Sequence, residues 1–148
     1  FLNSLKDLKS LSISVVVVTR TRCEQLRRCL YSLTELKRRP DEIIVVDNNS
    51  TDNTKEVVNS FNTLLPIKYV YEPRVGIPIA RNAGVKVASG DIIAFTDDDA
   101  VVDRLWLTYI EKAFLKDPKI GVVGGSIHNL KSNRNDLINE YFSIATEI

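Results

Sequence analysis

Short apolar runs alternate along this chain with segments whose apolar residues recur at helical spacing. The first run, Ile13 to Thr19, is β-branched and apolar on both faces, which is typical of a strand buried on both sides of a parallel sheet. From Arg22 to Arg39 the spacing predicts a helix, which Pro40 ends. This order of strand and helix indicates an α/β fold with a mostly parallel sheet flanked by helices.

The same alternation predicts the remaining elements. Further strands are expected over residues 42–47, 67–72, 91–96 and 120–124, and further helices over residues 52–61, 78–88 and 103–115. We interpret residues 1–148 as one domain, with its core over residues 12–126 and a C-terminal helical segment over residues 131–148. Because the chain begins without Met and stops inside an apolar-periodic stretch, we expect a fragment with an incomplete sheet.

Composition narrows the class of protein. The chain has 148 residues, enough for one core, and its 20 Lys and Arg against 19 Asp and Glu leave a formal charge of +1. No global field then draws it to nucleic acid, so we expect no nucleic-acid partner. The longest apolar run is too short to span a membrane. Cys23 and Cys29 match neither a zinc pair nor a disulfide framework, and we interpret them as buried thiols of a cytoplasmic protein.

Three of the predicted strands end in polar clusters, at residues 19–22, 47–52 and 97–99. Ligands of parallel sheets gather at the carboxyl ends of the strands, so these clusters should share one rim. Adjacent carboxylates repel by about 1 kcal/mol per pair at 4 Å in water, and oxygen ligands without His or Cys suit Mg²⁺ or Mn²⁺ on a phosphate. The alternative is that Asp97 to Asp99 form a solvated loop and helix cap, since Asp is favoured there.

The cluster after the second strand has two interpretations. Asp47 ends an apolar strand, where its carboxylate can meet a base or a ribose hydroxyl. Turn and capping chemistry is the alternative for this loop, and we assign it to Ser50 and Asp52. Positive charge for a diphosphate could come from arginines that are otherwise simply solvated, namely Arg20, Arg22, Arg74 and Arg81. The absence of GxGxxG and GxxxxGK[ST] argues against dinucleotide and P-loop sites.

Three stretches, ISVVVVTRTR, EIIVVDNNSTDNT and EPRVGIPIARNAGVKVASGDIIAFTDDDAVVDRLWL, together resemble the N-terminal half of family 2 glycosyltransferases with the GT-A fold. The match covers roughly residues 12–126, and the combination of motifs is far more specific than any one of them. The resemblance implies a site for a nucleotide-diphosphate sugar. It puts Thr19 and Arg22 by the nucleotide, Asp47 by its base, and Arg81 by base or diphosphate. Asp97 and Asp99 match the DxD motif, holding the ribose and the metal on the diphosphate, and Asp98 is counted with Asp97 among the residues that bind the nucleotide sugar.

The expected function is therefore metal-dependent transfer of a sugar, inverting by family analogy, from a nucleotide-diphosphate sugar to an acceptor hydroxyl, with Mn²⁺ or Mg²⁺. A UDP-sugar is favoured because an ionised Asp47 accepts hydrogen bonds only, which suits the N3–H of uracil. The residues after Asp99 show no family motif for a general base, so we expect that base beyond residue 148. A non-catalytic nucleotide-sugar-binding module is the alternative, whereas a nucleotidyltransferase would need a glycine-rich loop that TRTR lacks.

The expected partners follow from the same resemblance. The acceptor could be a sugar, a lipid or a protein, and the full-length protein could lie at the cytoplasmic face of the membrane. The apolar stripe between Leu137 and Ala145 is expected to cover the sheet, to contact a second copy in a homodimer or to take the place of absent sequence, because Tyr141 and Phe142 would otherwise be exposed.

Overall fold

The structure, a computed structural model, describes residues 10–128. Its elements run in the order β1 (Ile13–Thr19), α1 (Cys23–Thr34), β2 (Glu42–Asp47), α2 (Thr54–Ser60), β3 (Ile67–Tyr71), α3 (Ile77–Val87), β4 (Ile92–Asp97) and α4 (Trp106–Lys116). Two compact units make up the chain, one up to Leu107 and one from Thr108. Each of these elements was predicted from the apolar pattern, with differences mainly at the boundaries.

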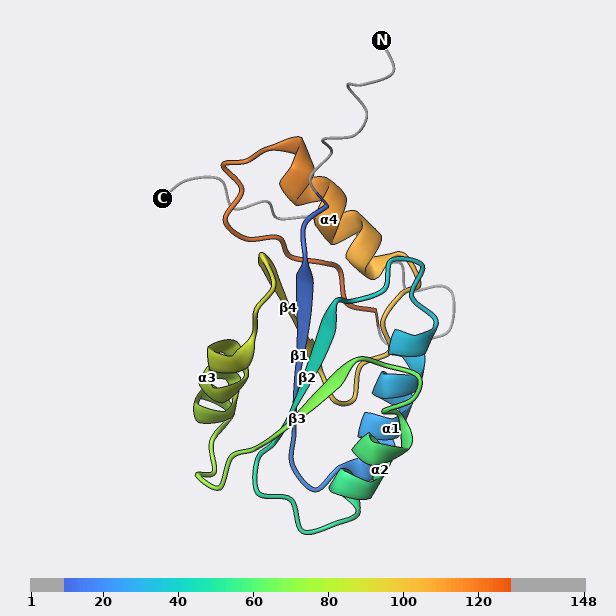
Figure 1. The fold of residues 1–148 in the computed structure, drawn as a ribbon, viewed down its shortest axis with the longest axis vertical. Coiled ribbons are helices and arrows are strands. Elements are labelled where there is room, and N and C mark those ends of the chain that lie inside the picture. The colour runs from blue at the N-terminus through green and yellow to red at the C-terminus, as the bar shows by residue number, and fades with distance from the viewer. Residues whose placement is uncertain (1–9, 129–148) are drawn as a thin grey trace. The chain divides into compact units, whose positions relative to one another are not determined.

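The first unit is built on a parallel sheet with the strand order β3-β2-β1-β4. Helices α1 and α2 lie on one side of this sheet and α3 lies on the other (Figure 1). The predicted α/β fold with a parallel sheet is thus confirmed. The register places Thr19 opposite Asp47 and Val18 opposite Asp97, so the polar ends of β1, β2 and β4 meet at one edge.

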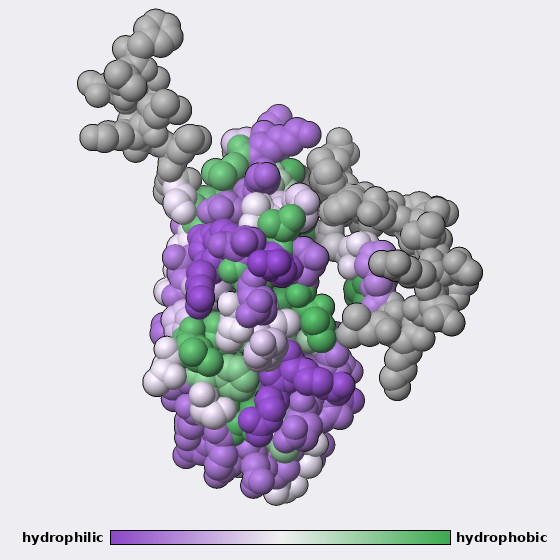
Figure 2. All heavy atoms as spheres, turned by 90° about the vertical axis from the view of Figure 1, so that its right-hand side faces the viewer, coloured by the Kyte–Doolittle hydropathy of each residue, from purple (hydrophilic) through white to green (hydrophobic). Residues whose placement is uncertain are grey.

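Strand β1 is one of the two interior strands of the sheet, and its residues are buried accordingly. All five residues from Ile13 to Val17 are fully buried, including the polar Ser14, because helices cover both faces of the sheet. Helix α1 contributes a stripe of buried leucines, Leu26, Leu30 and Leu33, and each adds roughly 2 kcal/mol to the hydrophobic stabilisation. The face that carries α1 and α2 is mainly hydrophilic on its outside, with small apolar patches (Figure 2).

Helix α1 ends five residues earlier than the predicted limit of Arg39. Beyond Thr34 the backbone N–H of Glu35 bonds to Ser32 O at 3.2 Å, and that of Lys37 bonds to Arg104 O at 2.9 Å. A long-range hydrogen bond thus replaces the helical one. Leu36 is buried although it follows the helix, so the apolar spacing continues past Thr34. This is why the spacing predicted a longer helix than the structure has.

Two predictions concern the C-terminal part of the chain. The strand predicted over residues 120–124 is wrong, because this segment of the second unit contains only one bridge residue, Val123, and Val122 is 65% exposed. An apolar run becomes a strand only when a neighbouring strand bonds along it. The predicted helical segment over residues 131–148, with its proposed dimer contact, lies outside the described residues. No helix within residues 10–128 is long and apolar enough to cross a membrane.

The two cysteines are free thiols in different surroundings. Cys29 is buried, and burial raises the pKa of its thiol to about 12, with the negative charges of the three aspartates adding to the shift. Cys23 is only partly buried, so the prediction of two buried thiols holds for Cys29 alone. The reason is position, since Cys23 is the first residue of α1 and Cys29 lies on its buried stripe.

Candidate functional site

A pocket of about 570 Å³ opens at the carboxyl ends of β1 and β4, beside the start of α3. It contains six of the seven residues predicted to contact nucleotide or metal: Thr19, Arg22, Arg81, Asp97, Asp98 and Asp99. The sheet register causes this convergence, because β1 and β4 are paired neighbours and end at the same level. The exception among the predicted residues is Asp47, which does not line the pocket.

The three consecutive aspartates face different surroundings. The side chain of Asp98 is only 7% exposed and accepts hydrogen bonds from Thr19 Oγ1 at 2.8 Å and Arg22 Nη1 at 3.1 Å. The side chains of Asp97 and Asp99 are 72% and 56% exposed. A buried carboxylate needs such partners to offset its lost hydration, whereas exposed ones remain able to bind a ligand. Asp98 therefore belongs to the internal framework, and Asp97 and Asp99 offer their oxygens to the pocket.

Each exposed aspartate has an arginine beside it. Arg22 Nη1 lies 3.3 Å from Asp99 Oδ2, and Arg81 Nη2 lies 3.5 Å from Asp97 Oδ1. The hydrogen bond from Arg22 to Asp98, together with the charges of Asp98 and Asp99, raises the pKa of its guanidinium, so Arg22 stays cationic. Exposed ion pairs of this kind contribute little to stability. Both arginines can therefore exchange a carboxylate for an anionic ligand at small cost.

The donor set of the pocket sets limits on metal binding. In the described part of the chain no group of three or more His, Cys, Asp or Glu side chains could hold a metal ion. Asp97 and Asp99 supply two exposed carboxylates beside a pocket rich in arginine. Mg²⁺ and Mn²⁺ commonly bind one or two carboxylates and complete their shell with water and phosphate oxygens. The residues thus fit a hard cation that arrives with a phosphate ligand.

Asp47 has its carboxylate engaged inside the protein. Its Oδ1 accepts a hydrogen bond from the backbone N–H of Ser50 at 2.8 Å, and its Oδ2 accepts one from Tyr69 Oη at 2.6 Å. Asp47 is only 4% exposed. Burial raises the pKa of the Tyr69 hydroxyl, and the bond to Asp47 raises it further, so this hydroxyl remains a donor. The predicted contact of Asp47 with a base stays a prediction.

The neighbouring Asn48 does line the pocket, and the sequence analysis missed it. Its Nδ2 donates to the carbonyls of Glu72 and Arg74 at 3.0 and 2.8 Å, and its Oδ1 accepts from Gly76 N at 2.8 Å. Asn48 thereby holds the loop between β3 and α3 against the pocket. Gly76 has a φ of 154°, a conformation that favours glycine. Nothing in the turn-forming sequence DNNS distinguishes this long-range role from an ordinary turn.

An apolar wall completes the pocket and was not predicted either. Val75 and Ile77 flank Gly76 and are 50% and 60% exposed, and Phe95 on β4 is 45% exposed. Exposed apolar side chains facing several polar groups are typical of a site for a ligand with both a ring and a charge. The signal available in the sequence was Phe95, a large aromatic residue two positions before the aspartates.

Capping at the second cluster follows the expectation for Asp52 only. Asp52 accepts hydrogen bonds from the backbone N–H groups of Thr54 and Cys23, the first residues of α2 and α1. Burial by itself would raise the pKa of Asp52, but the hydrogen bond from Thr54 Oγ1, together with these backbone bonds, outweighs burial and lowers it. Ser50 instead accepts a bond from the backbone N–H of Thr21 at 2.8 Å. Ser50 and Asp52 thus join the loop after β2 to the segment between β1 and α1.

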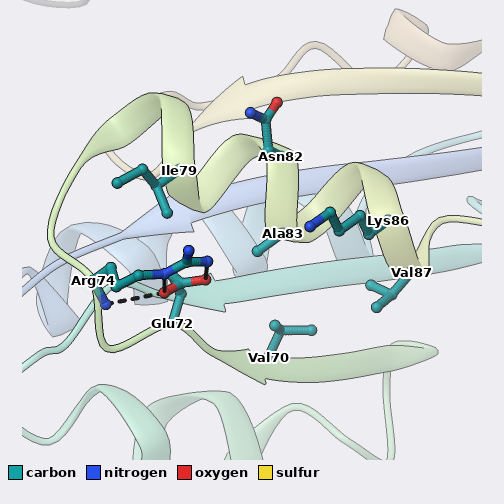
Figure 3. Close-up of a pocket in the computed structure, with 8 residues that line it drawn as sticks. All are labelled: Val70, Glu72, Arg74, Ile79, Asn82, Ala83, Lys86 and Val87. Atoms are coloured by element: carbon teal, nitrogen blue, oxygen red, sulfur yellow. Dashed lines mark hydrogen bonds and ion pairs between the residues drawn. The ribbon is translucent and has the colours of Figure 1, made fainter.

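Arg74 lies away from this pocket. It forms two hydrogen bonds with Glu72, from Nε at 2.8 Å and from Nη2 at 2.9 Å, in a separate cavity of about 380 Å³ between β3 and α3 (Figure 3). The bonds from Arg74 lower the pKa of Glu72 to about 2. Arg20, in contrast, lines the first pocket. Of the four candidate arginines, Arg20, Arg22 and Arg81 therefore line the same pocket as the aspartates, and Arg74 does not.

Comparison with known proteins now identifies the family. The family described as "Glycosyl transferase family 2" matches residues 14–143. The chain belongs to glycosyltransferase family 2. A related curated protein is the validoxylamine A glucosyltransferase of Streptomyces hygroscopicus subsp. limoneus, 39% identical over 89 residues, which cover 57% of this chain and 20% of that protein. The resemblance seen in the sequence motifs is thus confirmed.

Solved structures agree with this assignment to family 2. The mannosyltransferase PcManGT of Pyrobaculum calidifontis, in complex with GDP-Man and Mn²⁺, superposes with a TM-score of 0.68 at 29% identity, over 77% of this chain and 35% of that one. S. aureus TarS 1-349 in complex with UDP-GlcNAc gives a TM-score of 0.63 at 27% identity, over 72% and 31%. The chain spans less than half the length of these relatives.

Proposed function

We propose that this family 2 chain binds a nucleotide-diphosphate sugar in the pocket at the ends of β1 and β4 and serves metal-dependent, inverting transfer of the sugar to an acceptor hydroxyl. The observation that carries the proposal is the convergence of two exposed carboxylates, Asp97 and Asp99, with Arg22 and Arg81 around one pocket. Opposite charges in this arrangement suit a diphosphate together with a divalent cation. The complexes of two relatives with nucleotide sugars support the ligand class.

The residues divide into ligand-binding and positioning groups. Asp97 and Asp99 would hold Mn²⁺ or Mg²⁺, which as a Lewis acid stabilises the negative charge that develops on the leaving diphosphate. Arg22 and Arg81 reach the phosphate oxygens, where guanidinium groups can bind in a bidentate manner. Buried Asp98 orients Arg22. The exposed apolar residues Val75, Ile77 and Phe95 offer a surface to the rings of the donor.

The same proposal includes the nucleobase of the sugar donor, the catalytic general base and the acceptor. We favour a uridine nucleotide, supported by the UDP-GlcNAc complex of TarS, although PcManGT holds GDP-Man. Inversion requires a general base on the face of the sugar opposite the diphosphate. The carboxylates that line the pocket are Asp97 to Asp99, all on the side assigned to the diphosphate, so we place the base outside residues 10–128. The cytoplasmic location and the acceptor stay predictions.

Calorimetric titration with UDP, GDP and ADP, each with and without Mn²⁺, tests the ligand class. We expect UDP to bind more tightly with Mn²⁺ than without it, and equal affinities would contradict metal dependence. Displacement of UDP by stoichiometric GDP or ADP would contradict the uridine preference. In the full-length protein, donor binding without any transfer or hydrolysis of the sugar would favour the alternative, a non-catalytic binding module.

A further inference from the structure

One nitrogen of Arg22 joins two consecutive carboxylates. Arg22 Nη1 lies 3.1 Å from Asp98 Oδ1 and 3.3 Å from Asp99 Oδ2, so a single cationic group pairs with the inner and the outer aspartate at once. Arg81 differs, because within residues 10–128 the aspartate it pairs with is Asp97 alone, at 3.5 Å. The position between Asp98 and Asp99 is thus taken by a cation that belongs to the protein itself.

We propose that Arg22 is a positioning residue that acts as the internal counter-ion of Asp99 in the free protein and moves to the diphosphate when nucleotide and divalent cation bind together. The consequence is positive coupling, in which the protein alone binds the cation weakly and the nucleotide greatly increases that affinity. This inference rests on the proposed function, since it concerns the same pocket.

Electrostatics gives the direction of the coupling. A divalent cation that binds Asp97 and Asp99 without nucleotide meets the positive charge of Arg22 a few ångströms away and must either tolerate the repulsion or displace the arginine. A diphosphate adds enough negative charge to hold both cations at once. The nucleotide therefore removes the competition between Arg22 and the metal ion, and by linkage the metal ion increases the affinity for nucleotide by the same factor.

The geometry allows Arg22 to move without disturbing the fold. Its side chain is 52% exposed, so leaving Asp99 uncovers little apolar surface. Its backbone carbonyl accepts the hydrogen bond of Leu26 N at 2.9 Å, which anchors the residue at the start of α1. Only the contact with Asp99 has to break, because the buried Asp98 can keep both its bond from Thr19 Oγ1 and its pairing with Arg22. The side chain already lines the pocket, so the path to a bound diphosphate is short.

Titration of the protein with Mn²⁺, alone and with saturating UDP, tests the proposal on the wild type and on Arg22→Gln. The ratio of the two Mn²⁺ affinities measures the coupling without any need for sugar transfer. For Arg22→Gln we expect about tenfold tighter Mn²⁺ binding in the absence of UDP and a coupling ratio about tenfold smaller than in the wild type. A purely structural role for Arg22 would leave Mn²⁺ binding unchanged or weaken it, which would overturn the proposal.

Arg20→Gln is the matched control, because Arg20 lines the same pocket and carries the same charge, but none of the ion pairs described at the aspartates involves it. We expect its coupling ratio to equal that of the wild type. An equal effect of both variants would overturn the proposal in favour of general electrostatics. If the wild type binds neither UDP nor Mn²⁺, the proposed function fails, whereas coupling that is insensitive to Arg22 contradicts only this inference.

A measurement on the wild type guards against a variant that fails to fold. The side-chain Nε–H signal of Arg22 in NMR spectra reports directly on its partner, and diamagnetic Mg²⁺ can replace Mn²⁺. We expect the signal to shift markedly when Mg²⁺ and UDP are added together and only slightly with Mg²⁺ alone at the same concentration. A signal that stays unchanged with both ligands bound would overturn the proposal.

Discussion

At the scale of single residues, the triple aspartate shows how neighbours in sequence acquire different roles. Asp98 is enclosed by Thr19 and Arg22, while Asp97 and Asp99 remain exposed. Successive side chains at the end of a strand point in different directions, so three like residues meet three environments. We therefore expect a substitution of Asp98 to affect the fold, and a substitution of Asp97 or Asp99 to affect ligand affinity.

We predict that Asp99→Asn weakens metal-assisted UDP binding by about 1 to 3 kcal/mol, the usual contribution of a charge-assisted contact. The melting temperature should change little, because the Asp99 side chain is 56% exposed. Calorimetry with and without Mn²⁺ measures the effect. Glu24→Gln is the control: it removes an exposed carboxylate on α1, away from the three aspartates, and should bind UDP like the wild type. Unchanged metal-assisted affinity in Asp99→Asn would contradict the assignment of Asp99.

At the scale of elements, two contacts hold the site-bearing strands in place. Helix α3 approaches the sheet closely at Gly84, where a Cβ atom would lie 2.6 Å from Val16 Cγ1 and 3.1 Å from Val46 Cγ2. At the start of β2, at the end of the sheet away from the pocket, buried Glu42 accepts hydrogen bonds from Ser14 Oγ and from Ser89 and pairs with Lys68. Glu42 thereby ties β1, β2, β3 and the turn before β4 together.

We predict that Gly84→Ala lowers the free energy of unfolding by about 1 to 2 kcal/mol. Overpacking against the buried Val16 costs typically 1 to 3 kcal/mol, and the better helix propensity of alanine returns up to about 1 kcal/mol. Urea denaturation measures the change. Val85→Ala on the exposed side of the same helix is the control and should shift stability by only a few tenths of a kcal/mol. Stabilisation by Gly84→Ala would show that the helix can move away from the sheet.

The buried Glu42 predicts a dependence of stability on pH. Burial by itself would raise its pKa, but hydrogen bonds from Lys68, Ser14 and Ser89 outweigh burial and lower the pKa from 4.5 to about 2. A group whose pKa is lowered in the folded state stabilises above its unfolded value, so its contribution is complete above pH 4.5 and is lost as pH falls toward 2. The loss is at most about 3 kcal/mol.

Denaturation of the wild type and of Glu42→Gln across pH 2 to 7 isolates this contribution. We expect the variant to be less stable at pH 7 and the difference between the two proteins to shrink as the pH falls below 4.5. Glu35→Gln, at an exposed position after α1, should follow the wild type throughout. A difference that stays constant with pH would show that Glu42 has the same pKa in the folded and unfolded states.

At the scale of the whole molecule, a ligand that binds only the folded chain stabilises it by mass action, so binding in the proposed pocket should raise the stability. A ligand present at 100 times its dissociation constant adds about 2.7 kcal/mol, which for a chain of this size raises the melting temperature by roughly 5 to 10 °C. We predict such a rise with UDP and Mn²⁺ together and a much smaller one with either alone. Thermal unfolding followed by circular dichroism tests this, with Asp99→Asn as the control that loses the combined effect.

Several features of the chain could be predicted from its sequence because they depend on local periodicity. The β-branched run of β1, the leucine stripe of α1 and the polar residues after each strand are all visible in the order of residues. Parallel strands joined by helices leave few topologies, so the convergence of Thr19, Arg22 and the aspartates followed from the fold class. The family motifs lie in the same places, since strand ends position the ligand-binding groups.

The tertiary structure alone decided which of these polar residues face the pocket. Asp47 and Asn48 are adjacent, yet Asp47 bonds to Tyr69 while Asn48 holds the loop that reaches Gly76. Besides the local bond of Asp47 to Ser50 N, their side chains find partners on β3 and the loop after it, more than twenty residues away. The local sequence therefore does not determine which of the two faces the pocket. The same holds for Arg22 between Asp98 and Asp99 and for the segment 120–124, because hydrogen bonds and ion pairs between distant segments form only once the sheet has brought them together.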